Sequence, residues 1–253
     1  MQKYKIIKSD QEIALIRESA RILAQVRQKV KQAIKPGVSL LELDAIAYKE
    51  TLRLGAKPAF LGYSGFQHTI CASVNEQLIH GIPSQRILQD GDLLSIDMGV
   101  DYKGYKSDSA FSISVGQETA ENKKLIQAAE DAFYAAINAI KPGATTKDLS
   151  KAIYSVIKRN GFFATTDFSG HGIGKNLHED PNIFNYPIES KGFVLKNNMV
   201  ICIEPMVTQK SSKVKVLKDG WTVVAVSGLK SSHYEHTVLI KDGKAEILSA
   251  DLD

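Results

Sequence analysis

The chain has 253 residues, of which 43% are hydrophobic and 24% are charged, and its formal net charge is +4. This composition is typical of a globular protein with one large domain or two small ones, and it excludes an intrinsically disordered chain. No apolar run approaches the roughly 20 residues that a membrane helix needs, and the N-terminus MQKYKIIKSD has no signal-peptide apolar region. We therefore expect no membrane association.

The cysteines indicate the compartment of the protein, and one basic segment raises the question of a nucleic-acid partner. Cys71 and Cys202 each fall within a strand-like apolar run, so we expect no disulfide framework and a reducing, cytoplasmic setting. The segment Lys210–Lys218, KSSKVKVLK, is locally basic. A solvated surface is the simpler explanation of this cluster, so we expect no specific nucleic-acid partner, although an RNA-facing role stays open.

The first predicted elements are two capped helices. A capping box, Ser9-Asp-Gln-Glu12, starts a helical pattern of apolar residues that runs through Val30. The motif AIKPG at 33–37 breaks this pattern, and a second capping box starts at Ser39. The second pattern stops at Gly55, which suits a left-handed helix end.

Three strands are predicted next: Thr69–Val74, Leu93–Val100 and Ser109–Val115. The segment Asp101–Gly104 reads as a turn, and folding the chain about Tyr102 and Lys103 places Asp97 opposite Asp108. Directly opposed residues have Cβ atoms about 5 Å apart. Two carboxylates about 4 Å apart repel each other by about 4 kcal/mol at an effective dielectric of about 20, unless one takes up a proton or a cation lies between them. Taken alone, an aspartate that belongs to the turn and faces water is the simpler reading.

The same order of elements recurs in the second half of the chain. A helical pattern runs from Thr119 through Ile137, AIKPG returns at 139–143, a capping-box variant starts at Thr145, and Gly161 ends the next pattern. The second AIKPG begins 106 residues after the first, and the caps and glycine stops agree at that offset. This agreement favours an internal duplication over chance recurrence of Pro-Gly breaks.

The duplication predicts a single catalytic domain, 1–253, with halves of approximately 9–115 and 119–240. The strands predicted for the second half are Val200–Val207, Thr222–Val226 and His233–Ile240. Two acids, Glu204 and Glu235, lie in these apolar runs, and Glu204 falls one residue from the position equivalent to Asp97. Four carboxylates from both halves could converge on one site, and such a cluster needs about two divalent ions to be stable.

The histidines add candidates for the same site. His171 lies among three glycines in SGHGIGKNLHEDP, which suits a ligand on a tight loop, and His178 follows seven residues later. His80 precedes Gly-Ile-Pro, whereas His236 adjoins an acid on a strand and therefore points to the other face. His68 reads as a polar loop residue. A histidine beside glycines is more often a turn residue, so spacing alone leaves these roles open.

Seven motifs in order resemble the methionine aminopeptidases: SVNEQLIHGIP, DLLSIDMG, SDSAFSISV, SGHGIGKNLHEDP, VICIEPM, DGWTV and YEHTV. The resemblance runs from about Ile6 to Ile240, and it points to the short type I form of bacteria and organelles. It implies an α/β "pita-bread" fold, in which helices flank a curved antiparallel sheet and two halves are related by a pseudo-two-fold axis.

The resemblance also implies the site residues. The implied metal ligands are Asp97, Asp108, His171, Glu204 and Glu235. They would hold two divalent ions (Co, Mn, Fe(II) or Zn), with Asp108 and Glu235 bridging them. Glu204 would also move protons, and His80 and His178 would donate hydrogen bonds to the substrate. The implied substrate pocket consists of Tyr63, Phe66, Cys71, His80, His178 and Trp221.

The implied activity is removal of the N-terminal methionine from peptides and nascent proteins with a small second residue, by a metal-activated hydroxide. A monomer is expected. Ribosome association is implied because the family acts on nascent chains. Two positions depart from the family pattern: His233 stands where glutamine is usual, and Leu177 stands where an aromatic residue often precedes the second histidine. Both bear on the substrate pocket rather than on the metal ligands.

Three other functions remain as alternatives. An X-Pro aminopeptidase or prolidase would share the fold, but these enzymes usually have an additional N-terminal domain. A non-catalytic binding protein on this scaffold would have lost ligand residues that are present here. A two-metal phosphoesterase is disfavoured because the sequence has no glycine-rich phosphate loop.

Overall fold

The computed structural model describes residues 5–251, so the outer bounds of the predicted domain lie outside the described residues. Its α-helices are α1 (Asp10–Ala33), α2 (Leu40–Arg53), α3 (Ala120–Ala139) and α4 (Thr146–Arg159). They form at the predicted positions. Helices α1, α2 and α4 begin with a capping box, in which a hydroxyl residue and an acid three positions later exchange hydrogen bonds. Both bonds are present for Ser9 and Glu12, Ser39 and Glu42, and Thr145 and Asp148. The predicted caps are therefore confirmed.

The two AIKPG motifs occupy the same place in the two helix pairs. Gly37 ends the first copy with φ 93°, and Gly143 ends the second with φ 81°. The predicted helix stops, Gly55 and Gly161, also have positive φ, 76° and 78°. These backbone conformations favour glycine, because a Cβ would clash in the left-handed region.

A nine-stranded antiparallel sheet forms the centre of the molecule. Its main path is β1 (Lys57–Pro58), β4 (Leu93–Tyr102), β5 (Tyr105–Ser114), β14 (Glu235–Lys241), β9 (Val200–Ile203), β7 (Ser169–Gly172) and β8 (Glu179–Phe184). Off this path, β2 (Ile70–Val74) pairs with β4, and β15 (Lys244–Ile247) pairs with β14. The sequence halves thus meet where β5 pairs with β14.

Two smaller sheets lie beside the large one. One contains β13 (Ser231–His233), β10 (Met206–Thr208) and β6 (Phe163–Ala164). The other contains β11 (Val214–Val216), β12 (Val223–Ala225) and β3 (Gln77–Ile79). A short 3₁₀ helix, η1, covers Tyr63–Gly65.

Two predicted strands are in fact each divided in two. The run 200–207 forms β9 and β10 with a break at Glu204 and Pro205, and the run 233–240 forms β13 and β14 with a break at Tyr234. Proline has no backbone N–H for a strand ladder, so Pro205 ends the pairing of β9. Beyond the breaks, β10 pairs with β13 in a separate sheet. These two breaks place acids at strand ends.

The predicted register of the β4–β5 hairpin is also wrong. Asp97 lies opposite Ala110, and Asp108 lies opposite Gly99. The hairpin turns about Lys103 and Gly104, which both have positive φ, rather than about Tyr102 and Lys103. Such two-residue turns match the twist of the strands. Because the acids are diagonal instead of opposed, they still share one face of the sheet.

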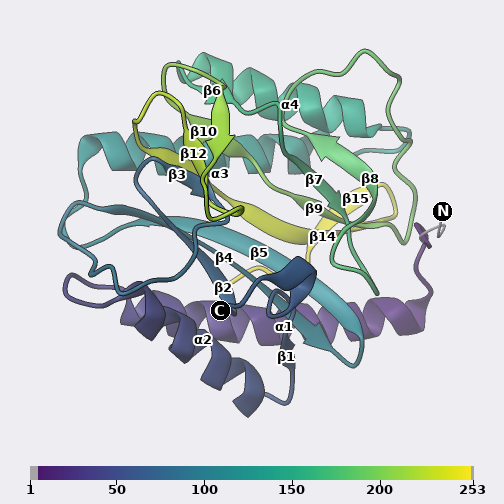
Figure 1. Cartoon of the computed structure of the whole chain (residues 1–253). Helices are drawn as coiled ribbons and strands as arrows, with labels where there is room; N and C mark the ends of the chain where they lie inside the picture. The colour runs from purple at the N-terminus through teal and green to yellow at the C-terminus, as the bar shows by residue number, and fades with distance from the viewer. Residues whose placement is uncertain (1–4, 252–253) are drawn as a thin grey trace.

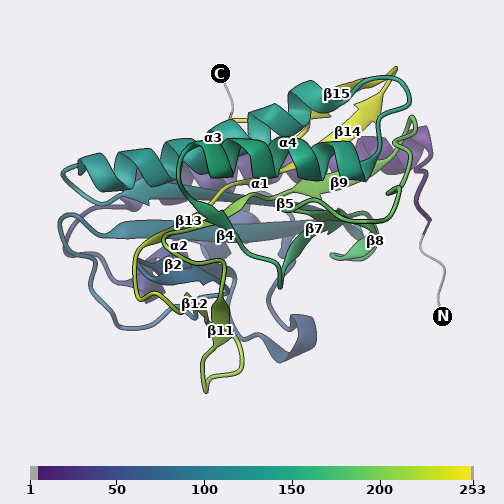
Figure 2. The same ribbon diagram turned by 90° about the horizontal axis from the view of Figure 1, so that it is seen from above.

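Alternation along the strands separates a helix-covered face from a pocket face. Ile96 and Met98 of β4 pack in the cluster under α1 and α2, and Ile201 and Ile203 of β9 pack in the cluster under α3 and α4. Figure 1 shows the two helix pairs against the two ends of the sheet, and Figure 2 shows β11 and β12 on the side opposite α3 and α4. Intervening residues such as Asp97 therefore face away from the helices.

Membrane insertion finds no support in these helices. Among residues 5–251, none of them combines the length and apolarity that crossing a bilayer requires.

Candidate active site

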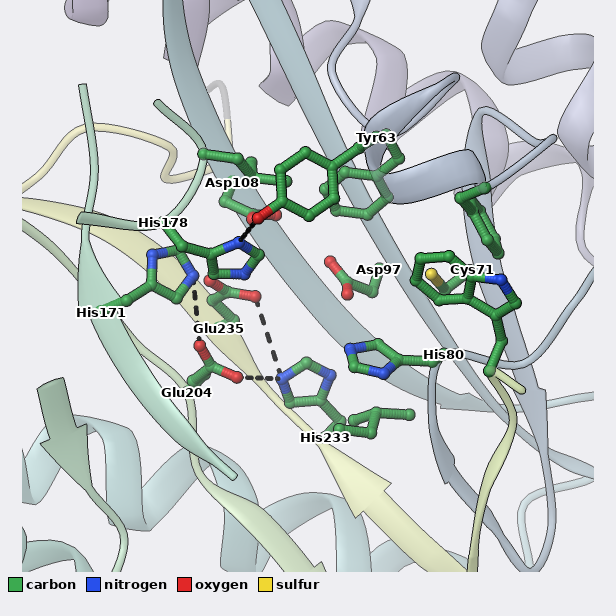
Figure 3. A pocket seen from close by; sticks show the side chains of 15 residues that line it. Tyr63, Cys71, His80, Asp97, Asp108, His171, His178, Glu204, His233 and Glu235 are labelled. Carbon is green, nitrogen blue, oxygen red and sulfur yellow. Dashed lines mark hydrogen bonds and ion pairs between the residues drawn. The ribbon is translucent and has the colours of Figure 1, made fainter. Parts of the chain in front are cut away.

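One pocket of about 120 Å³ brings together every site residue predicted from the sequence. Its lining residues are Phe60, Tyr63, Phe66, Cys71, Ile79, His80, Asp97, Asp108, His171, Leu177, His178, Glu204, Trp221, His233 and Glu235. Figure 3 shows the labelled side chains around one pocket, with carboxylates and imidazoles facing one another. Residues that are distant in the sequence are therefore neighbours in the fold.

Four carboxylates form the floor of this pocket. Asp97 lies on β4 and Asp108 on β5, whereas Glu204 follows the last residue of β9 and Glu235 is the first residue of β14. Within residues 5–251, an oxygen of Asp97, of Asp108 and of Glu235 is buried without a hydrogen-bond partner. Buried acceptors without partners are rare in native proteins and call for an ion or water to satisfy them.

When they are ionised, the carboxyl groups also repel one another. Burial raises the pKa of Asp108 well above its usual value, and the neighbouring charges of Glu235, Asp97 and Glu204 raise it further. Burial likewise raises the pKa of Glu204 and of Glu235 well above the usual range, with Asp97 adding to both shifts. A cation among these groups would relieve both the burial and the repulsion. The donor set therefore fits divalent metal ions, and oxygen-rich sets suit hard to borderline ions.

His171 presents a nitrogen to this cluster. Its Nδ1–H donates to the carbonyl oxygen of Gly172 at 2.9 Å, because a carbonyl can only accept. Nε2 is then left with a lone pair, 3.5 Å from Oε1 of Glu204. Burial lowers the pKa of His171 to about 3, so the ring is neutral at pH 7. A neutral imidazole whose other nitrogen is held by a hydrogen bond is the usual form of a metal ligand.

The glycines around His171 permit close strand packing. A Cβ on Gly170 would lie 2.4 Å from the carbonyl oxygen of Cys202, and one on Gly172 would lie 2.1 Å from that of Asp180. Neither position can accept a side chain without moving the backbone. The predicted close approach of this segment is therefore confirmed.

His178 lies on the rim of the pocket, beyond His171. Its Nδ1 is 2.7 Å from the hydroxyl of Tyr63, and its ring centroid is 4.3 Å from that of His171. Protein atoms that exclude water from part of the ring lower the pKa of His178, which favours the neutral imidazole. If the tyrosine hydroxyl donates to Nδ1, Nε2 carries the proton and can donate into the pocket.

His80 lies on the opposite wall. Its φ is 57°, an uncommon value for a residue with a side chain, and such values concentrate at functional sites. The following residue, Gly81, packs so closely that a Cβ would lie 2.4 Å from the carbonyl oxygen of Ala72. Burial lowers the pKa of His80 to about 4. The close packing at Gly81 accompanies this strained backbone.

Aromatic side chains form the outer wall. The rings of Phe66 and Trp221 meet edge to face with centroids 5.0 Å apart, and Trp221 also meets His80 at 6.4 Å. Cys71 of β2 lies directly opposite Asp97 of β4, so its thiol borders both the carboxylates and the apolar wall. This wall suits an apolar, polarisable side chain.

Sequence reasoning missed two lining residues, Phe60 and Ile79. Phe60 packs on β4 where Gly99 leaves room, since a Cβ there would lie 2.8 Å from its ring. Phe60 lies outside the seven motifs, and Ile79 lies within SVNEQLIHGIP without being marked there as a pocket residue. Tertiary structure is needed to show that both line the pocket.

The histidines expected outside the site do lie elsewhere. His236 faces away from the pocket, and its Nδ1 is 2.9 Å from the Ser249 hydroxyl and 3.2 Å from the Arg27 guanidinium. His68 faces Asp44, with Nδ1 3.3 Å from the carboxylate. The readings of both as non-site residues are consistent with these contacts.

Comparisons with known proteins agree with this geometry. Residues 14–242 match metallopeptidase family M24. Methionine aminopeptidase 1 of Bacillus subtilis is 44% identical over 244 residues, which cover 96% of this chain and 98% of that protein. The crystal structure of a methionine aminopeptidase from Thermotoga maritima superposes with a TM-score of 0.93 at 37% identity, covering 96% of this chain and 98% of that one.

A prolidase from Pyrococcus furiosus shares the architecture with a lower TM-score and a lower sequence identity. Its TM-score is 0.81 at 28% identity, and the match covers 98% of this chain but 66% of the prolidase. The match to the methionine aminopeptidases is the closer one and extends over nearly the whole of both proteins. The predicted pita-bread fold is confirmed by these superpositions. The chain therefore belongs to metallopeptidase family M24 and, within it, to the methionine aminopeptidases.

Proposed function

We propose that this protein removes the N-terminal methionine from peptides and nascent polypeptides, with a preference for a small second residue. The observation on which this rests is the meeting, in one pocket, of four buried carboxylates, the lone pair of His171 and an aromatic wall. The relatives that match over nearly the whole chain are named methionine aminopeptidases, which supports the same activity.

The metal set in this proposal is two divalent ions of Co, Mn, Fe(II) or Zn. Asp97, Asp108, His171, Glu204 and Glu235 would hold these ions, and Asp108 and Glu235 would each serve both of them. When bound, such ions supply Lewis acidity and lower the pKa of water toward about 7, which provides a nucleophile for the methionine carbonyl.

Glu204 is the proposed proton carrier. It lies at the pocket edge with about 9% of its surface exposed, whereas Asp108 and Glu235 are more deeply buried. Its position at the pocket edge places this carboxylate beside both the pocket interior and the open side, where it can exchange a proton with water and substrate. Its carboxylate takes the proton from the attacking water and delivers it to the nitrogen of the leaving amine.

His178 and His80 are the proposed donors to the substrate. The proposed role assigns His178 the tautomer in which the Tyr63 hydroxyl, 2.7 Å away, donates to Nδ1. Nε2–H is then left to donate to the scissile carbonyl. His80 lies across the pocket and orients the scissile amide. Such donors are worth about 3 kcal/mol each in comparable enzymes, because they stabilise charge that develops in the transition state.

The methionine side chain would lie against Phe66, Cys71 and Trp221. Thioethers make favourable contacts with aromatic edges, so this wall fits methionine better than a polar residue. The preference for a small second residue rests on the family resemblance. Action on nascent chains would place the enzyme in the cytoplasm near the ribosome. A monomer is part of the proposal as well.

The deciding experiment is a peptide assay after chelation. Protein stripped of metal is reloaded separately with Co, Mn, Fe(II) or Zn and incubated with Met-Ala-Ser. We expect release of methionine only after reloading. A control peptide, Ala-Pro-Ser, tests the alternative of an X-Pro aminopeptidase. Preferential cleavage of that control would contradict the proposal, and failure to bind any of the four ions would indicate a non-catalytic binding protein.

A further inference from the structure

His233 is a buried histidine whose ring has nothing to bond to within residues 5–251. About 2% of its surface is exposed, and neither Nδ1 nor Nε2 has a hydrogen-bond partner. A buried polar group without a partner loses the hydrogen bonds that it makes with water, at a penalty of about 1–3 kcal/mol. An imidazole in this state calls for an ion, a water molecule or another ligand.

The backbone of His233 is held in place while its ring is left free. Its N–H donates to the Ser112 hydroxyl at 3.0 Å, and that hydroxyl donates to the His233 carbonyl oxygen at 2.9 Å. Pairing of β13 with β10, where His233 lies opposite Met206, adds a second restraint. Both neighbouring strands therefore set the backbone position from which the ring enters the pocket (Figure 3).

Two acids face the ring at distances that suit a shared ion. Nε2 of His233 is 3.6 Å from Oε2 of Glu204 and 3.9 Å from Oε2 of Glu235. These separations are too long for hydrogen bonds. Donor atoms about 2.0–2.2 Å from a tetrahedral ion lie about 3.4 Å from one another, which is close to the observed spacing. One atom from each of the three residues falls within 4.8 Å of the other two.

Glu204 stands between two imidazoles. Its Oε1 lies 3.5 Å from Nε2 of His171, and its Oε2 lies 3.6 Å from Nε2 of His233. Each oxygen thus has its own nitrogen neighbour (Figure 3). This arrangement could hold one nitrogen-ligated ion on each side of the carboxylate.

We propose that His233, Glu204 and Glu235 bind a divalent cation, so that His233 is a metal ligand in addition to the five carried over from the family. The proposal builds on the proposed metal site. Glutamine is usual at this position, and an amide is a weaker ligand than an imidazole for borderline ions. The expected consequence is tighter binding of Zn and Co, with little effect on Mn, because imidazole favours the former ions.

Metal titration of variants tests the proposal without an activity assay. His233→Gln restores the usual family residue, and His68→Gln is the matched control because His68 lies outside the pocket. Affinity for Zn, Co and Mn is measured calorimetrically against a competing chelator, and bound ions are counted by mass spectrometry. For His233→Gln we expect Zn and Co affinity to fall by at least about 10-fold, since even residues that only orient ligands are worth 10–100-fold. His68→Gln should match the wild type.

A second measurement does not depend on any variant folding. Crystals of the wild-type protein loaded with Zn, analysed by anomalous diffraction, should show an ion about 2.1 Å from Nε2 of His233. Unchanged Zn and Co affinity in His233→Gln, or a nearest ion more than about 3 Å from that nitrogen, would overturn the proposal. Loss of peptidase activity with this binding intact would instead count against the proposed function, so the two failures can be told apart.

Discussion

The two acid pairs of the pocket are positioned in different ways. Asp97 and Asp108 lie inside β4 and β5, two continuous ten-residue strands, so the register of one hairpin places both. Glu204 and Glu235 lie where predicted strands break, and each therefore depends on how the chain leaves one sheet for another. The regular half supplies a rigid pair of short side chains, and the broken half supplies longer side chains at strand ends.

The nitrogen donors follow the same division. His171 and His233 both come from the second half, and they lie on opposite sides of Glu204. The first half contributes His80 on the far wall. The first half of the chain thus contributes only oxygen donors to the pocket floor, whereas the second half contributes both nitrogen and oxygen donors. We expect the second half to move protons and select the metal, while the first half mainly holds charge.

The largest expected effect is that of Glu204→Gln. The amide cannot take up the proton from water, so kcat for Met-Ala-Ser should fall by about 10²–10⁴-fold while the fold persists. Steady-state kinetics, circular dichroism and bound-metal analysis on the same sample provide the measurement. Asp97→Asn is the comparison from the first half, and it should reduce metal occupancy more than it changes the pH profile of kcat. Near wild-type turnover in metal-loaded Glu204→Gln would refute the proton role.

Next in size is His178→Ala. Loss of a donor to the scissile carbonyl should lower kcat by about 10²–10³-fold, with bound metal retained. Tyr63→Phe removes only the group that orients this imidazole, and a loss of about 1 kcal/mol there corresponds to about 5-fold in kcat. Kinetics and metal analysis of both variants test the order of effects. If His178→Ala loses its metal instead, His178 is a ligand and the assignment is wrong.

A smaller effect is expected for the pH dependence of stability in Asp108→Asn. Burial and three neighbouring carboxylates raise the pKa of Asp108 in the folded protein. The stability that the protonated group contributes is present below the ordinary carboxyl pKa and is lost as pH rises through the raised value. Without metal, the wild type should therefore lose stability relative to Asp108→Asn as pH rises above about 4.

Calorimetry in chelator across pH 4.5 to 8 provides this measurement, and the histidine contributions common to both proteins largely cancel in the difference. Adding a divalent ion should reverse the order, because binding stabilises the wild type more. If the wild type instead gains stability relative to Asp108→Asn as pH rises in chelator, burial and the neighbouring carboxylates do not raise the pKa of Asp108.

The smallest effects are expected at the equivalent helix caps. Ser39→Ala and Thr145→Ala each remove a hydroxyl that accepts from the N3 amide, in α2 and α4 respectively. Each should lower stability by about 1 kcal/mol and Tm by about 2–4 °C. Thermal unfolding compares them directly. Markedly unequal losses of stability would show that the two helix pairs contribute differently to the stability of the fold, despite their matching caps.

Much of the site could be predicted because its motifs are local. The ligand-like residues and most of the pocket wall were found by resemblance, and the pocket includes every one of them. Phe60 and Ile79 were missed since their place in the pocket depends on how distant segments pack. His233 was recognised as a departure, but its unpartnered ring and its distances to two acids are visible only in the fold.

By itself, the sequence determined the helices, their caps, the glycine stops and the alternation that places acids on one face. These features depend on hydrogen bonds and periodicity within a few residues, such as those of Ser39 with Glu42. Tertiary structure decided the register of Asp97 against Ala110, the breaks at Pro205 and Tyr234, and the meeting of both halves at β5 and β14. The physical reason is that backbone groups of a strand can be satisfied in more than one register, and the local pattern leaves these registers equivalent. Turn geometry selects the register within the β4–β5 hairpin, and packing selects partners as distant as Glu235 and Ala110.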